Sequence, residues 1–314
     1  MEPRFTRRGL GAAALAGTAA AALAACGAGS DPLKDKDSSG DSGGGDQKVG
    51  KVVRIGSQDY YSNEVIAELF ALVIEKAGGT VDRQYRIGQR EVYMSEIEAG
   101  KIDLFPEYLG NTLQYFQKDA TAKTAEEIHK ALGESMPKGW EALAFAEAAD
   151  QDSINTTAEF AKEHSLKQLG DLAGIKDLKV AANSEFEARP YGPKGLKKVY
   201  GADVSVVGVE DSGGPLTVKA LLDGDVQLAD IYSADPAIKK NGFVTLEDPK
   251  SLILPQNVVP LAKSALEDAH KKAVEGVIAK LTTDELIALN TDSVDSGAKA
   301  SVVAEKWLKK QGLL

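Results

Sequence analysis

The 314-residue sequence predicts an α/β fold with mostly parallel sheets. Short apolar segments alternate along the chain with longer segments whose apolar residues recur at helical spacing. Several helical segments end at glycine, the residue that most often follows the last turn of a helix. A helix also passes through glycine into a strand twice in similar form, at residues 98–104 and 222–228. These three observations together favour helices packed on sheets.

The first predicted elements lie between residues 51 and 136. Residues 51–56 form a strand that ends in glycine, and Ser62 or Asn63 caps a helix that stops at Gly78-Gly79. The apolar residues of this helix follow helical spacing: Val65, Ile66, Leu69, Leu72 and Val73. The next predicted elements are an extended segment at 80–87, a helix at 91–99, a strand at 102–105 and a helix at 125–136.

The remaining predicted elements continue the alternation. The predicted strands are residues 178–182, 204–209, 226–231 and 243–246. The predicted helices are residues 194–200, 216–222, 265–280 and 299–310.

The two helix–glycine–strand segments each precede a tyrosine, Tyr108 and Tyr232, at the same distance from their glycines, Gly100 and Gly224. If the segments are equivalent parts of two similar lobes, both tyrosines follow the carboxyl end of a strand. Ligands of open α/β sheets bind at that edge. The alternative is coincidence, because such turns are common.

The N-terminus has the pattern of a secretory signal. Arg4, Arg7 and Arg8 precede an apolar run at 10–23, and small residues lead to Cys26. The run is too short and too rich in alanine to span a bilayer stably. A cysteine at this place resembles the lipobox of bacterial lipoproteins, where the thiol is acylated after cleavage. We therefore predict a signal peptide at residues 1–25 and lipidation of Cys26.

Residues 6–10 also resemble a twin-arginine export signal, so the export route is open between that pathway and ordinary secretion. Residues 26–48 contain mainly Gly, Ser, Asp and Lys, and they predict a flexible linker after the lipidated cysteine. No later segment is apolar over a length that spans a bilayer.

The charge of the chain limits its partners. The formal net charge is −10, and an acidic surface argues against nucleic acid as a partner. Cys26 is the one cysteine, so no second thiol exists for disulfides or catalysis. His129, His164 and His270 lie far apart without metal-ligand spacing. We therefore predict no enzyme activity, no metal and no cofactor.

Three segments carry a family resemblance: Arg-Ile-Gly-Ser at 54–57, Ile-Asp-Leu-Phe-Pro-Glu-Tyr-Leu-Gly-Asn at 102–111, and Phe-Glu-Ala-Arg-Pro at 186–190. They resemble the ProX- or OpuC-type osmoprotectant-binding proteins of ABC importers, which are receptors for glycine betaine, carnitine, choline and proline. The similarity covers about residues 50–313 in the same motif order.

The resemblance implies a two-lobed periplasmic-binding-protein (venus flytrap) fold, type II-like, with two crossover strands. The expected crossings lie near 148–152 and 254–257. Lobe I is then residues 49–148 and 257–314, and lobe II is residues 149–256. The ligand lies in the cleft between the lobes, which close by a hinge motion.

The implied ligand is a quaternary-ammonium osmolyte that is glycine betaine-like. A trimethylammonium group has no N–H, so it is held by the negative faces of aromatic rings, each worth about 0.5–2 kcal/mol. The resemblance places Tyr108 and Tyr232 in this cage, with Phe186 flanking the ligand. The implied partners are an ABC permease with its ATPase and, through the lipid, the outer face of the cell membrane. A monomer is expected.

The polar residues of the implied site are Arg189, Asn111 and Asn63. Arg189 matches the arginine that contacts the ligand carboxylate, for which a forked guanidinium is suited. The alternative for Arg189 is a surface ion pair with Glu185 or Glu187. Asn111 stands where many relatives have threonine, and Asn63 stands where some have glutamine.

The sequence departs from the family pattern at Ile154 and Gln256, where relatives carry cage tyrosines. Tyr60, Tyr61 and Tyr191 are candidates to compensate, and we include Tyr61 and Gln256 among the candidate ligand-binding residues. Two alternatives remain open: the same fold with an aromatic or polyhydroxylated ligand, and a cell-surface module without a transport role.

Overall fold

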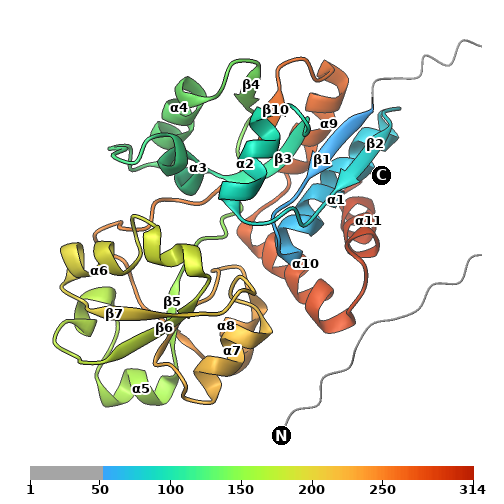
Figure 1. The fold of residues 1–314 in the computed structure, drawn as a ribbon. Coiled ribbons are helices and arrows are strands. Elements are labelled where there is room, and N and C mark those ends of the chain that lie inside the picture. Colours follow the sequence, from blue (N-terminus) through green and yellow to red (C-terminus); the bar gives the residue numbers. More distant parts are fainter. Residues whose placement is uncertain (1–51) are drawn as a thin grey trace, which may run out of the picture. The chain divides into compact units, whose positions relative to one another are not determined.

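The computed structural model describes residues 52–314, which form two five-stranded sheets with helices packed against them (Figure 1). The predicted signal peptide, Cys26 and the linker lie outside the described residues. No helix within residues 52–314 is long and apolar enough to cross a membrane.

The first sheet has the strand order β2-β1-β3-β10-β4. Its strands are β1 (Val53–Gly56), β2 (Val81–Gln84), β3 (Leu104–Tyr108), β4 (Trp140–Ala142) and β10 (Val258–Lys263). The helices connected to these strands are α1 (Tyr61–Lys76), α2 (Arg90–Glu98), α3 (Leu109–Phe116), α4 (Ala125–Ser135), α9 (Asp268–Ile278), α10 (Thr283–Ser296) and α11 (Ala300–Lys310).

The second sheet has the strand order β7-β6-β8-β5-β9. Its strands are β5 (Ile154–Thr156), β6 (Leu178–Ala182), β7 (Val204–Gly208), β8 (Leu228–Asp230) and β9 (Val244–Thr245). The helices are α5 (Ala158–Glu163), α6 (Pro193–Tyr200), α7 (Pro215–Leu222) and α8 (Pro236–Asn241), with 3-10 helices η1 (Leu169–Leu172) and η2 (Ser184–Ala188).

Each sheet contributes core residues from both of its faces, because successive residues of a strand point to opposite sides. In β10, Val258 and Ala262 join the core that contains α1, α9, α10 and α11. Val259 and Leu261 of the same strand join the core that contains α2, α3 and α4. The second sheet divides in the same way between the clusters around α6 and α7. Each sheet therefore forms a three-layer α/β/α arrangement with its helices, which confirms the α/β prediction.

The prediction of mostly parallel sheets is wrong for half of each sheet. β1 pairs in parallel with β2 and β3, and β6 pairs in parallel with β7 and β8. β10 and β5, by contrast, are antiparallel to both of their neighbours. The chain enters β5 and β10 directly from the connections between the two sheets. They therefore run antiparallel to the neighbouring strands, which are linked by helical crossovers.

The two sheets repeat one topology. β3 and β8 are each the third strand in order, parallel to a central strand on one side and antiparallel to a strand from a connection on the other. The helix–glycine–strand segments at 98–104 and 222–228 lead into these two strands. Their similarity is therefore structural, as the equivalent-lobe interpretation predicts.

The chain passes from the first sheet to the second between β4 and β5 and returns between β9 and β10. The two connections contact each other through an isolated bridge between Ala149 and Asn257. The exact division into lobes at 148–149 and 256–257 stays a prediction, because the contacts group residues 49–314 as one compact unit.

The capping prediction for the first helix is wrong. α1 begins at Tyr61, and Tyr60 precedes it without a side-chain cap. Asn63 instead accepts a hydrogen bond from the N–H of Gln58 (2.8 Å) and donates one to the carbonyl of Pro106 (3.0 Å). Its side chain thus joins the segment after β1 to β3. The predicted stop is confirmed, since Gly78 follows the helix with a φ of +89°.

Several elements were not predicted, among them α3, α10 and β10. β10 contains Pro260, which normally argues against a central strand. Here Pro260 lies opposite Pro106 of β3. The carbonyl of Pro260 accepts from the N–H of Leu143, and the carbonyl of Pro106 accepts from the side chain of Asn63. Neither carbonyl faces the other strand, so this pair of residues needs no N–H donor in the β3–β10 ladder.

Gly192 allows a close backbone approach next to Phe186. A Cβ at Gly192 would lie 1.9 Å from the carbonyl oxygen of Phe186. We expect Gly192→Ala to lower the free energy of unfolding by about 1–3 kcal/mol, because the backbone between η2 and α6 must shift. The measurement is denaturant unfolding at equilibrium.

The control is Gly133→Ala in α4, where a Cβ would meet no atom within 4 Å. We expect this variant to gain about 0.5–1 kcal/mol. Equal stability of the two variants would contradict the packing argument.

Candidate functional site

The two sheets meet at a small cavity of about 40 Å³, enough for a few water molecules. Its lining comes from strand ends and the turns that follow them, where open α/β sheets bind ligands. The lining residues are Gln58, Tyr60, Gln89, Arg90, Tyr108, Asn111, Asp150, Asp152, Asn183, Glu185, Phe186, Arg189, Tyr191, Ser212, Gly213, Asp230 and Tyr232.

Five aromatic rings line the cavity: Tyr60, Tyr108, Phe186, Tyr191 and Tyr232. Tyr60 and Tyr232 pack edge to face, with ring centroids 5.1 Å apart. The hydroxyls of Tyr60 and Tyr108 are hydrogen-bonded at 2.6 Å. The structure therefore brings the three rings predicted from the family resemblance together with two of the three tyrosines proposed as compensation.

Tyr61 is the third of those tyrosines, and it does not line the cavity. Its hydroxyl donates to Asp235 at 2.8 Å, which joins the start of α1 to the start of α8. Ile154 also lies outside the lining; it is buried in the core of the second sheet.

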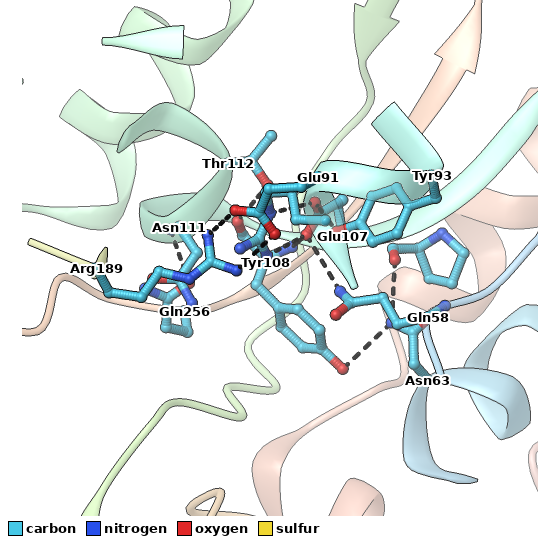
Figure 2. A network of polar contacts seen from close by, with 12 residues as sticks. Gln58, Asn63, Glu91, Tyr93, Glu107, Tyr108, Asn111, Thr112, Arg189 and Gln256 are labelled. Carbon is cyan, nitrogen blue, oxygen red and sulfur yellow. Dashed lines mark hydrogen bonds and ion pairs between the residues drawn. The ribbon is translucent and has the colours of Figure 1, made fainter. Parts of the chain in front are cut away.

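A buried carboxylate fixes the position of Tyr108 (Figure 2). Glu107 accepts hydrogen bonds from Arg90 (2.8 and 3.0 Å), from the hydroxyl of Tyr93 and from the N–H of Tyr108 (2.8 Å). Burial alone would raise the pKa of Glu107, but the Arg90 charge and these hydrogen bonds outweigh it and hold the pKa below its usual value. Glu107 is a structural anion behind the cavity.

Asn63 and Gln256 support the lining from behind. Besides Pro106, the side-chain amide of Asn63 reaches the Tyr108 hydroxyl at 3.5 Å. Gln256 is fully buried, and its amide donates to Asn111 (2.8 Å) while its carbonyl accepts from the Asn111 N–H (3.0 Å). Neither residue lines the cavity. Asn111 does, and it donates to Asp152 at 2.9 Å.

Arg189 lines the cavity and is held by an ion pair (Figure 2). Its partner is Glu91 of α2, at 2.9 Å. The alternative predicted from sequence was an ion pair with Glu185 or Glu187, and those partners are wrong. The observed pair connects α2 to the segment after η2, which belong to different sheets.

Three aspartates of the cavity were missed in the sequence: Asp150, Asp152 and Asp230. Burial raises the pKa of Asp150 to about 7. Burial and the neighbouring Asp152 raise the pKa of Asp230 well above its usual value. The signal was present, because Asp150 and Asp152 lie at the predicted crossing and Asp230 lies in the predicted strand at 226–231, two residues before Tyr232. Within residues 52–314, no acidic or histidine cluster is arranged to hold a metal ion.

A ring-lined cavity at the strand ends of two similar α/β sheets defines a solute-binding protein. The chain belongs to the family described as the substrate binding domain of ABC-type glycine betaine transport systems, whose model matches residues 51–310. This confirms the resemblance seen in the three sequence segments. The family consists of solute-binding proteins rather than enzymes.

Two curated relatives cover most of the chain. The glycine betaine-binding protein YehZ of Escherichia coli is 26% identical over 278 residues, which are 83% of this chain and 90% of that protein. The carnitine transport binding protein OpuCC of Listeria monocytogenes is 23% identical over 274 residues, which are 82% of this chain and 86% of that protein.

A solved structure described as a glycine betaine/carnitine/choline ABC transporter has the same fold. It aligns with a TM-score of 0.68 at 24% identity and covers 83% of this chain and 99% of that one. The periplasmic-binding-protein fold expected from the resemblance is thereby confirmed.

The raised pKa of Asp150 predicts a pH-dependent stability. Between about pH 4 and pH 7 the unfolded chain releases the Asp150 proton while the folded protein retains it, so stability falls as pH rises through this window. We expect Asp150→Asn to keep the hydrogen bond from the Ala234 N–H and to remove this part of the fall. Melting temperatures should show the variant gaining on the wild type from pH 4 to pH 8.

Asp203→Asn is the control, because Asp203 is an exposed partner of Lys197. A difference between Asp150→Asn and the wild type that is constant with pH would contradict the assignment.

Proposed function

We propose that this protein is the extracytoplasmic receptor of an ABC importer and that it binds a small quaternary-ammonium solute in the cavity at the strand ends. The observation that carries the proposal is the convergence of five aromatic rings from both sheets on one cavity. A quaternary ammonium lacks donors, so ring faces are the groups best able to hold it. The family and the names of the relatives, which specify glycine betaine and carnitine, support this solute class.

The number of rings in the cavity also compensates for the two positions, 154 and 256, at which the sequence lacks the tyrosines of the family pattern. Tyr60 and Tyr191 line the cavity, whereas Ile154 and Gln256, where the family resemblance leads us to expect tyrosines, do not. A set of five rings supports a retained cation site over a cell-surface module that has lost its ligand.

We further propose that the receptor is held at the membrane by a lipid on Cys26, with residues 27–48 as the connection to the folded part. The basic start, apolar run and small residues before Cys26 support this anchor. The permease and its ATPase are the proposed protein partners.

The ring of Tyr108 is expected to contribute directly to cation binding. Tyr108→Leu should weaken a quaternary ammonium by about 1–2 kcal/mol, roughly a tenfold or larger loss, because one ring face is removed from a desolvated site. Tyr108→Phe keeps the ring and loses only the hydroxyl contact with Tyr60, so its loss should be smaller. Isothermal titration with glycine betaine and choline measures both, and equal losses would remove ring contact as the cause.

The anchor is tested by Cys26→Ala in the full chain. Without the thiol no acyl chain can be attached, so we expect the protein to leave the membrane fraction for the medium or periplasm. Quantitative blotting of the fractions gives the answer. A variant that stays with the membrane would show that another element anchors the protein.

A further inference from the structure

A second cavity lies next to the ring-lined one, and it is much larger. Its volume is about 390 Å³, within the range of about 300–1,000 Å³ that is usual for sites of small organic ligands. It lies between α3 and the segment that runs from η2 to Tyr191. Its lining includes Gln114, Tyr115, Lys118, Glu185, Pro190 and Tyr191.

The linings of the two cavities overlap only in part. Four residues line both cavities: Asn111, Glu185, Arg189 and Tyr191. Gln114 and Tyr115, by contrast, line the second cavity and not the ring-lined one. A substitution at either of these two positions therefore changes the second cavity without removing a group from the first.

The charges around the second cavity balance. Arg189 and Glu91 form their ion pair at 2.9 Å, and both line this cavity. The other two charged residues of the lining are Lys118 and Glu185, which carry opposite charges and have no ion-pair partner within residues 52–314. A lining with no net charge gives neither a cation nor an anion a general advantage, so it suits a neutral solute.

Two oxygens of the lining residues lack a hydrogen-bond donor. Oε1 of Gln114 and Oε2 of Glu185 are buried, and neither has a partner within residues 52–314. A buried acceptor without a donor is costly, and a ligand with O–H groups can supply the missing donors. The Lys118 ammonium adds donors for the oxygens of such a ligand.

Two aromatic rings complete the lining. Tyr115 and Tyr191 line the second cavity together with Pro190. The Tyr115 ring packs edge to face on Phe116, with centroids 5.2 Å apart, and the Tyr191 ring lies 6.0 Å from that of Phe186. A sugar ring has C–H groups on its faces and hydroxyls around its rim, so aromatic faces and unpaired acceptors match its two kinds of surface.

We propose that the second cavity is a binding site for a neutral polyhydroxylated solute with a sugar-like ring. The ring of the solute lies against Tyr115 and Tyr191, and its hydroxyls donate to Gln114 and Glu185. This site is additional to the cation site in the ring-lined cavity, and the inference does not depend on the proposed function.

Three neutral probes test the site in the wild-type full chain, kept in a detergent without a sugar head group. Glucose and maltose carry a rim of hydroxyls on one or two rings, whereas cyclohexanol has a ring of similar size with one hydroxyl. We expect saturable binding of glucose or maltose with a dissociation constant of about 1 mM or below. Cyclohexanol should bind about tenfold or more weakly, because it leaves an acceptor unpaired. Isothermal titration measures all three.

Gln114→Leu and Tyr115→Leu test the assigned residues. Each should weaken the bound sugar about tenfold or more, through loss of an acceptor or of a ring face. Glycine betaine affinity should stay unchanged, because neither residue lines the ring-lined cavity. Gln114→Leu also removes a buried acceptor without a donor, so its melting temperature should not fall.

Gln117→Leu is the matched control, because Gln117 is an exposed glutamine directly after α3 that lines neither cavity. It should leave sugar and glycine betaine affinities as they are in the wild type.

Absence of saturable binding for both sugars would overturn the inference and leave the proposed cation receptor intact. Sugar binding that persists unchanged in Gln114→Leu and Tyr115→Leu would place the sugar elsewhere and overturn it as well. Failure of quaternary-ammonium solutes to bind the wild type would instead overturn the proposed function, while sugar binding lost in both variants would still support the second site.

Discussion

The buried ion pair between Glu107 and Arg90 is the interaction on which the rest of the cavity depends. Glu107 is fully buried within β3, and its oxygens bind Arg90, Tyr93 and the backbone of Tyr108. Removal of one partner from such a pair generally costs about 3–5 kcal/mol, because the other charge stays buried without compensation. This cost fixes the carboxyl end of β3, and therefore the ring of Tyr108, before any solute is present.

The second sheet presents its side of the cavity from the equivalent strand. β8 ends at Asp230 with Tyr232 two residues later, and β3 ends at Tyr108 itself. A repeated topology thus gives two tyrosines at corresponding strand ends, which is a simple way to assemble a ring-lined site from both halves of the fold. The halves differ in charge, because Glu107 next to Tyr108 is paired with Arg90, whereas Asp230 near Tyr232 has no ion-pair partner within residues 52–314.

Sequence patterns predicted the elements that have strong local signals. The apolar spacing of α1, the glycine stops and the parallel strands β1, β3, β6 and β8 were all evident from periodicity. Short strands such as β4 and β5 were missed because three residues are too few to show an alternating pattern. β10 was missed because it contains Pro260, which normally argues against a central strand. Those strands are antiparallel, so the sheet direction was only half predicted.

The site residues could be predicted from the sequence where a family motif indicated residues that come together only in the folded structure. Tyr108, Phe186, Arg189 and Tyr232 line one cavity, but their shared place rested on family resemblance rather than on spacing. The Glu91 partner of Arg189 is distant in sequence and gives no local pattern. The same holds for the aspartates, since burial decides whether an aspartate is an ordinary surface residue or a group with a raised pKa.

The paired connections between the sheets have a mechanical consequence. The N–H of Asp150 donates to the carbonyl of Gln256, and the N–H of Val258 donates to Ala148, so the two segments form one narrow ribbon. Torsion of this ribbon moves Asp150 together with Gln256, which grips Asn111. Any reorientation of one half against the other therefore acts directly on the polar groups that line the cavity.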